Sequence, residues 1–265
     1  MIRVNEKTIP FRPGMKVGDL VPAIKPGADL LIVNGFPVSP EAVLADGDVC
    51  CLIKRGEVPS PEEMESLLMA RHTPGVHALV KKAAVGIMGL GGLGSQVAQA
   101  LARIGVGRLL LADYDVVEPS NLNRQQYFVD QIGMKKTAAL KENLLRMNPY
   151  VQLDTIDIRL TEENIPELFK DVDALAECFD DPVLKAAGLR AAVTRLPATG
   201  YVGSSGVAGF GDSNALVTRQ LFPRVFLVGD GESAAAPGQG LMAPRVGIAA
   251  HHQANQILRL LLQRV

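Results

Sequence analysis

The stretch AVGIMGLGGLGS, residues 84–95, decides the fold of this chain. Residues 84–88 are an apolar run of the length of a buried strand. The glycines that follow have G-x-G-x-x-G spacing, and an apolar repeat of helical period comes after them: Gly89, Gly91, Gly94; Val97, Leu101, Ile104. Glycines let a phosphate approach the backbone, and the helix N-terminus behind them offers free N–H groups. The stretch therefore predicts a nucleotide-binding strand–turn–helix unit.

Strand-like and helical segments alternate on the C-terminal side of this unit. Further strands are predicted at residues 108–113, 151–160, 174–178 and 198–203, and helices at 136–147, 163–170, 182–193 and 246–263. Such alternation indicates an α/β fold with a doubly wound, mostly parallel, Rossmann-like sheet. Residues 203–213 and 234–244 are rich in small residues and are expected to be loops. Asp113 ends its strand, where an acid can hold ribose hydroxyls.

The first 56 residues have the pattern of a separate small unit. Short strands are predicted at residues 2–4, 9–11, 30–33 and 49–53, and a helix at 15–24. This order resembles the β-grasp, ubiquitin-like fold, and Val33-Asn34-Gly35 with residues 44–48 resembles the ThiS sulfur carriers. We therefore expect a ThiS-like domain at 1–56, a linker and helix at 57–82, and the larger domain at 83–265. Ser60 and Glu63 have capping-box spacing before a helix at 62–71, which residues 72–75 end.

Composition narrows the classes of protein that the chain can belong to. The formal net charge is −1 over 265 residues, so no basic field points to nucleic acid. No apolar run is long enough to cross a bilayer, and the N-terminus lacks a signal-peptide pattern. The three cysteines, Cys50, Cys51 and Cys178, cannot supply a Cys₄ zinc site. We expect a cytoplasmic protein without zinc, whose cysteines are packing residues.

A longer motif separates the glycine turn from that of a dehydrogenase. Residues 113–125, DYDVVEPSNLNRQ, resemble the signature of the ThiF/MoeB/HesA family, prokaryotic relatives of ubiquitin-activating enzymes. Residues 133–136 and 178–181 continue the resemblance in family order, so that it covers about residues 62–265. Residues 72–76 and 240–245 resemble a short ThiF subgroup that lacks the zinc cysteines.

The resemblance implies ATP-dependent adenylation of the terminal carboxylate of a sulfur-carrier protein, in thiamine thiazole synthesis. Arg124 and Lys136 would offset the negative charge of the phosphates, and Asn121 would hydrogen-bond phosphate or the attacking carboxylate. Asp180 would bind Mg²⁺, although Asp181 could be the ligand instead or cap the next helix. The implied nucleotide site also contains the following residues: Gly89, Gly91, Gly92, Gly94, Asp113, Asp115, Gln125. No general base is needed, because a carboxylate is already ionised at neutral pH.

Partners follow from the same resemblance. Relatives are homodimers, and Arg71 is a candidate to reach a partner subunit's site. The carrier must be a separate protein, because residues 54–59 replace the free Gly-Gly end that is adenylated. No cysteine follows Cys178, so an external sulfur donor would take the activated acyl group.

Three other functions compete with this one. A family relative activates the carboxylate of carbamoyl-threonine on tRNA, which the balanced charge disfavours. A NAD-dependent oxidoreductase would share the glycine turn but not residues 121–125. A non-catalytic carrier-binding module would not need Arg124, Lys136 and Asp180.

Overall fold

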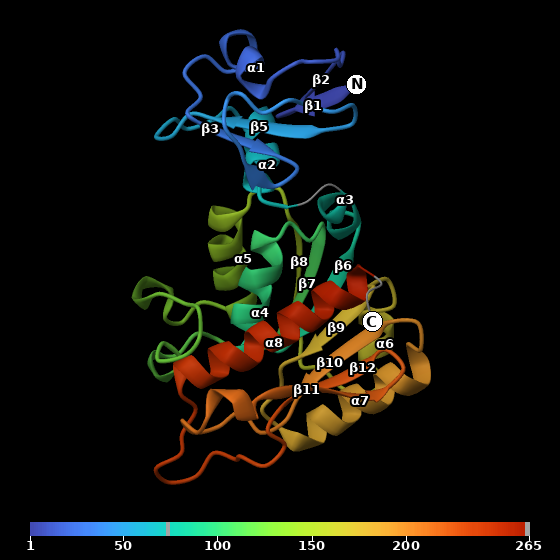
Figure 1. Cartoon of the computed structure of the whole chain (residues 1–265). Helices are drawn as coiled ribbons and strands as arrows, with labels where there is room; N and C mark the ends of the chain where they lie inside the picture. Colours follow the sequence, from blue (N-terminus) through green and yellow to red (C-terminus); the bar gives the residue numbers. More distant parts are fainter. Residues whose placement is uncertain (73–74, 263–265) are drawn as a thin grey trace. The chain divides into compact units, whose positions relative to one another are not determined.

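The computed structural model describes residues 1–72 and 75–262. The chain divides into two compact units, Met1–Ala78 and Leu79–Val265, which are drawn in Figure 1. The predicted break at residues 72–75 includes Thr73 and Pro74, and the last helix was predicted to reach Gln263. These three residues lie outside the described part.

The first unit has the predicted β-grasp topology. Its sheet has the order β2-β1-β5-β3-β4, in which β1 and β5 are parallel and the other neighbours antiparallel. The elements are β1 Ile2–Val4, β2 Lys7–Ile9, α1 Val17–Ile24, β3 Leu30–Val33, β4 Phe36–Pro37 and β5 Val49–Ile53. Leu20 of α1 packs with Ile2, Leu31 and Cys50 on one face of the sheet. The second strand begins earlier than predicted, and the two-residue β4 was not predicted.

The segment that follows β5 covers the other face of this sheet. Helix α2, Pro61–Leu68, places Leu67 against a cluster that contains Ile32 and Cys51. Only half of the predicted capping box forms: Ser60 Oγ accepts from the Glu63 amide at 3.4 Å. The Glu63 carboxylate instead accepts from Asn5 Nδ2 at 2.6 Å and from Lys25 Nζ at 2.9 Å. These bonds fasten α2 to the carrier-like sheet.

The second unit is a doubly wound sheet. Its elements are α3 Val76–Val80, β6 Ala84–Met88, α4 Gly92–Arg103, β7 Arg108–Asp113, α5 Lys136–Met147, β8 Gln152–Asp157, α6 Ile165–Leu168, β9 Ala174–Glu177, α7 Pro182–Arg195, β10 Gly200–Ser204, β11 Val217–Phe222, β12 Val225–Gly229 and α8 Ala243–Leu261. Short 3₁₀ turns occur at Pro119–Asn121, Val129–Gln131 and Ser213–Ala215. Helix α3 and the strand pair β11–β12 were not predicted.

The strand order β11-β12-β10-β9-β6-β7-β8 places the switch point between β6 and β9. All neighbours are parallel except β11, which runs antiparallel to β12 at one edge. Figure 1 shows α4 and α8 crossing one face, while Phe169, Ala191 and Leu196 of the α6–α7 layer pack on the other. In open α/β sheets, ligands bind outside the carboxyl ends of strands at this reversal. The fold thus sets the glycine turn at the position of a binding crevice.

Candidate functional site

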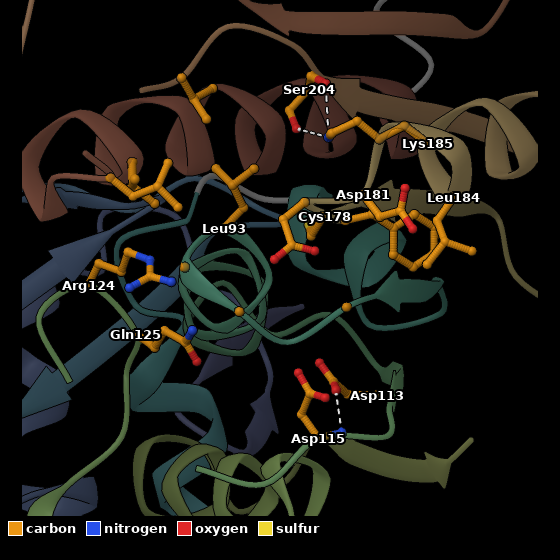
Figure 2. Close-up of a pocket in the computed structure, with 18 of the residues that line it drawn as sticks. Leu93, Asp113, Asp115, Arg124, Gln125, Cys178, Asp181, Leu184, Lys185 and Ser204 are labelled. Atoms are coloured by element: carbon orange, nitrogen blue, oxygen red, sulfur yellow. Dashed lines mark hydrogen bonds between the residues drawn. The ribbon is translucent and has the colours of Figure 1, made fainter. Parts of the chain in front are cut away.

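A cavity of about 370 Å³ opens at the switch point. Its lining includes most residues that the sequence predicted for the nucleotide site: Gly89, Gly91, Gly92, Asp113, Asp115, Arg124, Gln125, Lys136, Asp180. Figure 2 shows Asp113 and Asp115 on one side of the glycine turn and Lys185 and Ser204 on the other. The cavity therefore has two halves, one next to β6–β7–β8 and one next to β9–β10–β12. We call them the nucleotide half and the acceptor half.

The glycine turn is held from both sides. Asp113 accepts from the Leu90 amide at 2.6 Å and from the Asp115 amide at 2.8 Å. The hydroxyl of Tyr127 donates to the Leu90 carbonyl at 2.8 Å, and burial raises the pKa of this tyrosine far above its usual value. Asp113 thus has a structural role besides the predicted ribose contact. Tyr127, two residues after the family motif, was not predicted.

The glycines of the turn serve different purposes. A Cβ on Gly91 would meet nothing closer than Gln125 Nε2 at 3.7 Å, so this position borders open space. A Cβ on Gly94 would lie 1.9 Å from the Gly89 carbonyl oxygen. Gly94 does not line the cavity and instead lets α4 pack close to the turn. The backbone cradle that remains fits a phosphate group at a helix N-terminus.

The predicted cations both border the cavity but have different partners. Lys136, 6% exposed, donates to Asp115 Oδ2 at 2.8 Å, so a carboxylate offsets its charge. Arg124 donates only to neutral acceptors, the Ser120 carbonyl at 3.2 Å and Asn123 Oδ1 at 2.9 Å. Among the described residues no carboxylate pairs with Arg124. The Arg124 charge is therefore available for an anion, which Lys136 would have to share with Asp115.

The structure separates the two neighbouring aspartates. Asp181 is the N-cap of α7, because its Oδ1 accepts from the Val183 amide at 2.8 Å. Asp180 borders the cavity, and within residues 1–72 and 75–262 no group hydrogen-bonds its carboxylate. One free carboxylate beside a phosphate cradle is the donor set that Mg²⁺ uses with nucleotides. Asp180 therefore suits the metal role better than Asp181.

Two predicted residues have unexpected surroundings. Asn121 does not line the cavity, and its Oδ1 accepts from the Glu118 amide at 3.1 Å in a 3₁₀ turn. This bond shapes the loop that carries Arg124. Gln125 is 7% exposed, and its Oε1 has no hydrogen-bond partner among the described residues. An unpaired buried acceptor beside the turn is favourable only when a donor, such as a nucleotide hydroxyl or amine, occupies the site.

The acceptor half contains a buried ion pair that the sequence analysis missed. Glu177, 1% exposed, accepts from Lys185 Nζ at 2.9 Å. Lys185 also donates to the carbonyl and the hydroxyl of Ser204, at 3.1 and 3.0 Å. Burial raises the pKa of Glu177, and Lys185 opposes this rise. The signal in the sequence was an acid inside the apolar run at residues 174–178.

The cysteine at the floor of the cavity is not reactive. Cys178 is buried, and burial together with the nearby Glu177 raises the pKa of its thiol. Gln253 of α8 ties the strand ends around it, because its Nε2 donates to the Glu177 carbonyl at 2.9 Å and to the Val202 carbonyl at 3.1 Å. The two strand cysteines of the first unit are likewise buried, and the pKa of Cys50 is raised to about 12. A neutral thiol is a weak nucleophile, so the packing interpretation agrees with the structure.

Sequence comparison supplies relatives for both units. Residues 67–265 match the sequence model of the ThiF family, and residues 1–56 match that of ThiS-like ubiquitin. The adenylyltransferase and sulfurtransferase UBA4 of Eremothecium gossypii is 39% identical over 135 residues, which cover 48% of this chain and 30% of UBA4. The molybdopterin-synthase adenylyltransferase of Haemophilus influenzae is 41% identical over 96 residues, covering 36% of this chain and 40% of that protein. This chain thus matches well under two thirds of the length of either relative.

Solved structures share the fold of the second unit. The E. coli tRNA N6-threonylcarbamoyladenosine dehydratase TcdA, in complex with ATP, has a TM-score of 0.69 at 22% identity, covering 78% of this chain and 98% of TcdA. E. coli MccB with ATP has a TM-score of 0.54 at 21% identity, covering 77% of this chain and 60% of MccB. At this identity the likeness concerns the fold. Because the ThiF model matches residues 67–265, three quarters of the sequence, this chain belongs to the ThiF family.

Proposed function

We propose that this protein uses ATP to adenylate the C-terminal carboxylate of a separate ThiS-like sulfur carrier, in the formation of thiamine thiazole. The observation that carries the proposal is a cavity in which a glycine turn, the uncompensated Arg124 and the unbonded Asp180 meet. Membership of the ThiF family and the adenylyltransferase names of the relatives support the same reaction.

The reaction joins two anions. A carboxylate oxygen of the carrier attacks the α-phosphorus of ATP, and the bond from that phosphorus to the bridging oxygen of the β-phosphate breaks. The bonding electrons leave with pyrophosphate, and the product is an acyl-adenylate. Arg124 offsets the repulsion between the anions and the charge that collects on the leaving group. No residue has to remove a proton, because the carboxylate is already ionised.

The nucleotide half fits ATP through its own groups. The backbone around Gly91 and Gly92 would hold phosphate, Asp113 and Asp115 the ribose, and the unpaired Gln125 Oε1 would accept from a nucleotide donor. Lys136 exchanges its bond to Asp115 for a phosphate oxygen. Asp180 would hold Mg²⁺, which supplies positive charge at the phosphates when bound.

ATP–pyrophosphate exchange tests the proposal. We expect exchange that depends on a carrier with a free C-terminal Gly-Gly, and none with the same carrier amidated at its C-terminus. Exchange that depends on threonylcarbamoylated tRNA and not on a carrier would favour the tRNA alternative. Tight NADH binding without exchange would favour an oxidoreductase, and carrier binding without exchange a binding module.

The proposal includes assembly and transfer. We propose a homodimer and an external sulfur donor that takes the acyl group, because Cys178 is buried and protonated. Arg71 lies exposed in the first unit and stays a candidate for reaching a partner subunit. A monomer in light scattering, at micromolar concentration and with full exchange activity, would reject the dimer and the role of Arg71.

A further inference from the structure

The wall of the acceptor half is built from two loops with small side chains. Residues 205–212 follow β10 and residues 230–241 follow β12. They contribute the following residues to the cavity: Ser205, Gly206, Val207, Ala208, Ser233, Ala234, Ala235. Such side chains bury little apolar surface, so packing alone cannot fix where the wall stands. Its position must come from hydrogen bonds.

Backbone hydrogen bonds join the two loops to each other. The amides of Asp230 and Gly231 donate to the carbonyls of Gly206 and Ser205, at 3.0 and 3.1 Å. Farther along, the Gly209 amide donates to the Gly240 carbonyl at 2.8 Å. The loops are therefore paired at two points, which leaves open what fixes the pair to the rest of the unit.

Arg245, in the first turn of α8, makes that attachment. Its Nη1 donates to the carbonyls of Gly211 and Asp212 at 2.9 and 3.0 Å, and its Nη2 donates to Asp230 Oδ2 at 2.6 Å. Arg245 is 5% exposed. The other oxygen of Asp230 accepts from the amides of Glu232 and Ser233, both at 2.8 Å. One guanidinium thus connects both loops to one helix.

The place of this arginine argues that it serves the loops. The first turn of a helix is the least favourable position for a cation, because the helix dipole is positive there. Burial opposes ionisation of Asp230, but the amides of Ser233 and Glu232 and the Arg245 side chain outweigh it and lower its pKa to about 2. The pair is therefore fully charged at neutral pH, and Asp230 offsets the unfavourable charge of Arg245.

Other contacts hold α8 itself. Gln253 bonds the ends of β9 and β10, and Val246 packs against Gly92, where an added Cβ would lie 3.0 Å away. No hydrogen bond links Arg245 to a residue of the nucleotide half within the described ranges. Loss of the guanidinium should free the loops and leave α8 and the glycine turn in place.

We propose that the Arg245–Asp230 pair is a positioning device that fixes the acceptor wall against α8, and so governs binding of the carboxylate substrate but not of ATP. The inference rests on the proposed adenylation. A wall that moves weakens contacts made equally in the ground state and the transition state, which raises KM for the acceptor and leaves kcat unchanged.

The test compares Arg245→Met with Arg245→Lys and with a matched control, Arg259→Met. Arg259 lies on the same helix, is exposed, and donates to Gln256 of that helix. For Arg245→Met we expect the KM of a Gly-Gly carrier in pyrophosphate exchange to rise about 10- to 100-fold, the range for a displaced binding surface. The Kd of ATP, from calorimetry, should stay within about twofold, which is small beside a tenfold effect. Arg245→Lys, which can still pair with Asp230, should recover part of the loss, and Arg259→Met should resemble the wild type.

Hydrogen exchange gives a readout that does not depend on turnover. Amides at residues 205–212 and 230–241 should lose protection in Arg245→Met, while those of α4 and the glycine turn keep theirs. An equal change in acceptor KM and ATP Kd, or unchanged protection of both loops, would overturn the inference. If the wild type exchanges with no carrier, the proposed function fails, but loop protection and ATP binding still decide the role of Arg245. Should Arg245→Met not fold, Asp230→Asn removes the same ion pair, keeps the turn at Ser233, and is read by the same assays.

Discussion

The glycines of the turn allow its two roles, packing and phosphate binding, to be separated by single substitutions to alanine. At Gly94 the new Cβ would lie 1.9 Å from the Gly89 carbonyl oxygen, so α4 and the turn must separate by about 1.5 Å to reach ordinary contact. Overpacking of this kind costs about 3 kcal/mol, the upper end of its usual range. For a unit of this size the loss corresponds to a melting temperature lower by about 6–12 °C.

Gly91→Ala should behave in the opposite way. Its Cβ would meet only Gln125 Nε2 at 3.7 Å, and its φ is −75°, so the nucleotide-free protein should melt within about 2 °C of the wild type. The same methyl group projects into the cradle where phosphate must approach the backbone. ATP should bind at least about tenfold more weakly, a loss of about 1.4 kcal/mol.

Differential scanning fluorimetry and calorimetric ATP titration distinguish these outcomes. Gly240→Ala is the control, because a Cβ there meets nothing within 4 Å. Wild-type melting in Gly94→Ala would refute the close packing of α4 on the turn. Wild-type ATP affinity in Gly91→Ala would show that phosphate does not lie on this backbone, and the nucleotide assignment of the turn would have to be abandoned.

Further predictions concern charge and the first unit. Arg124→Ala should melt like the wild type and lose pyrophosphate exchange about 100-fold or more, the effect of removing a preorganised charge, and wild-type exchange would reject its role. Lys185→Met should lower the free energy of unfolding by about 3–5 kcal/mol in urea titration, because it strands the buried Glu177, and a change below about 1 kcal/mol would contradict the ion pair. Because the pKa of Asp230 is lowered, its contribution to stability is present above about pH 4 and disappears as pH falls towards 2; Asp230→Asn should flatten the stability profile in that window. A fragment of residues 1–72 should melt cooperatively and one of residues 1–56 should bind the dye ANS, since the latter lacks α2; equal behaviour would deny α2 a structural role.

The sequence was informative wherever a local pattern encodes the structure. The glycine spacing, the apolar period of α4 and the alternation after it predicted β6 to α7 and the parallel sheet. The pair β11–β12 was missed, because β11 is an edge strand with largely exposed side chains and lacks the apolar alternation of a half-buried strand. The boundaries of β8 were predicted too wide for a similar reason, since its flanking residues are apolar without pairing.

The candidate site divides in the same way. Residues within motifs could be named in advance, and the cavity gathers Asp113, Arg124, Lys136 and Asp180 from four separate segments. Contacts between segments left little trace in the sequence. A lysine eight residues after Glu177, or an arginine fifteen residues after Asp230, is an ordinary surface charge until the fold buries the pair.

The first unit shows how a carrier-like fold has ceased to be a carrier. In this chain the residues after β5 do not form a free end: Glu57 accepts from Lys25 Nζ at 2.6 Å, and Glu63 joins the same lysine to Asn5. Helix α2 then covers Ile32 and Cys51, which the sheet alone would leave exposed. Cleavage near Gly56 would therefore do more than create a terminal carboxylate, because it would separate the sheet from the helix that completes its core. An adenylating enzyme needs a carrier with a loose, unbonded end, and the ion pairs of this unit make residues 57–68 the opposite of one.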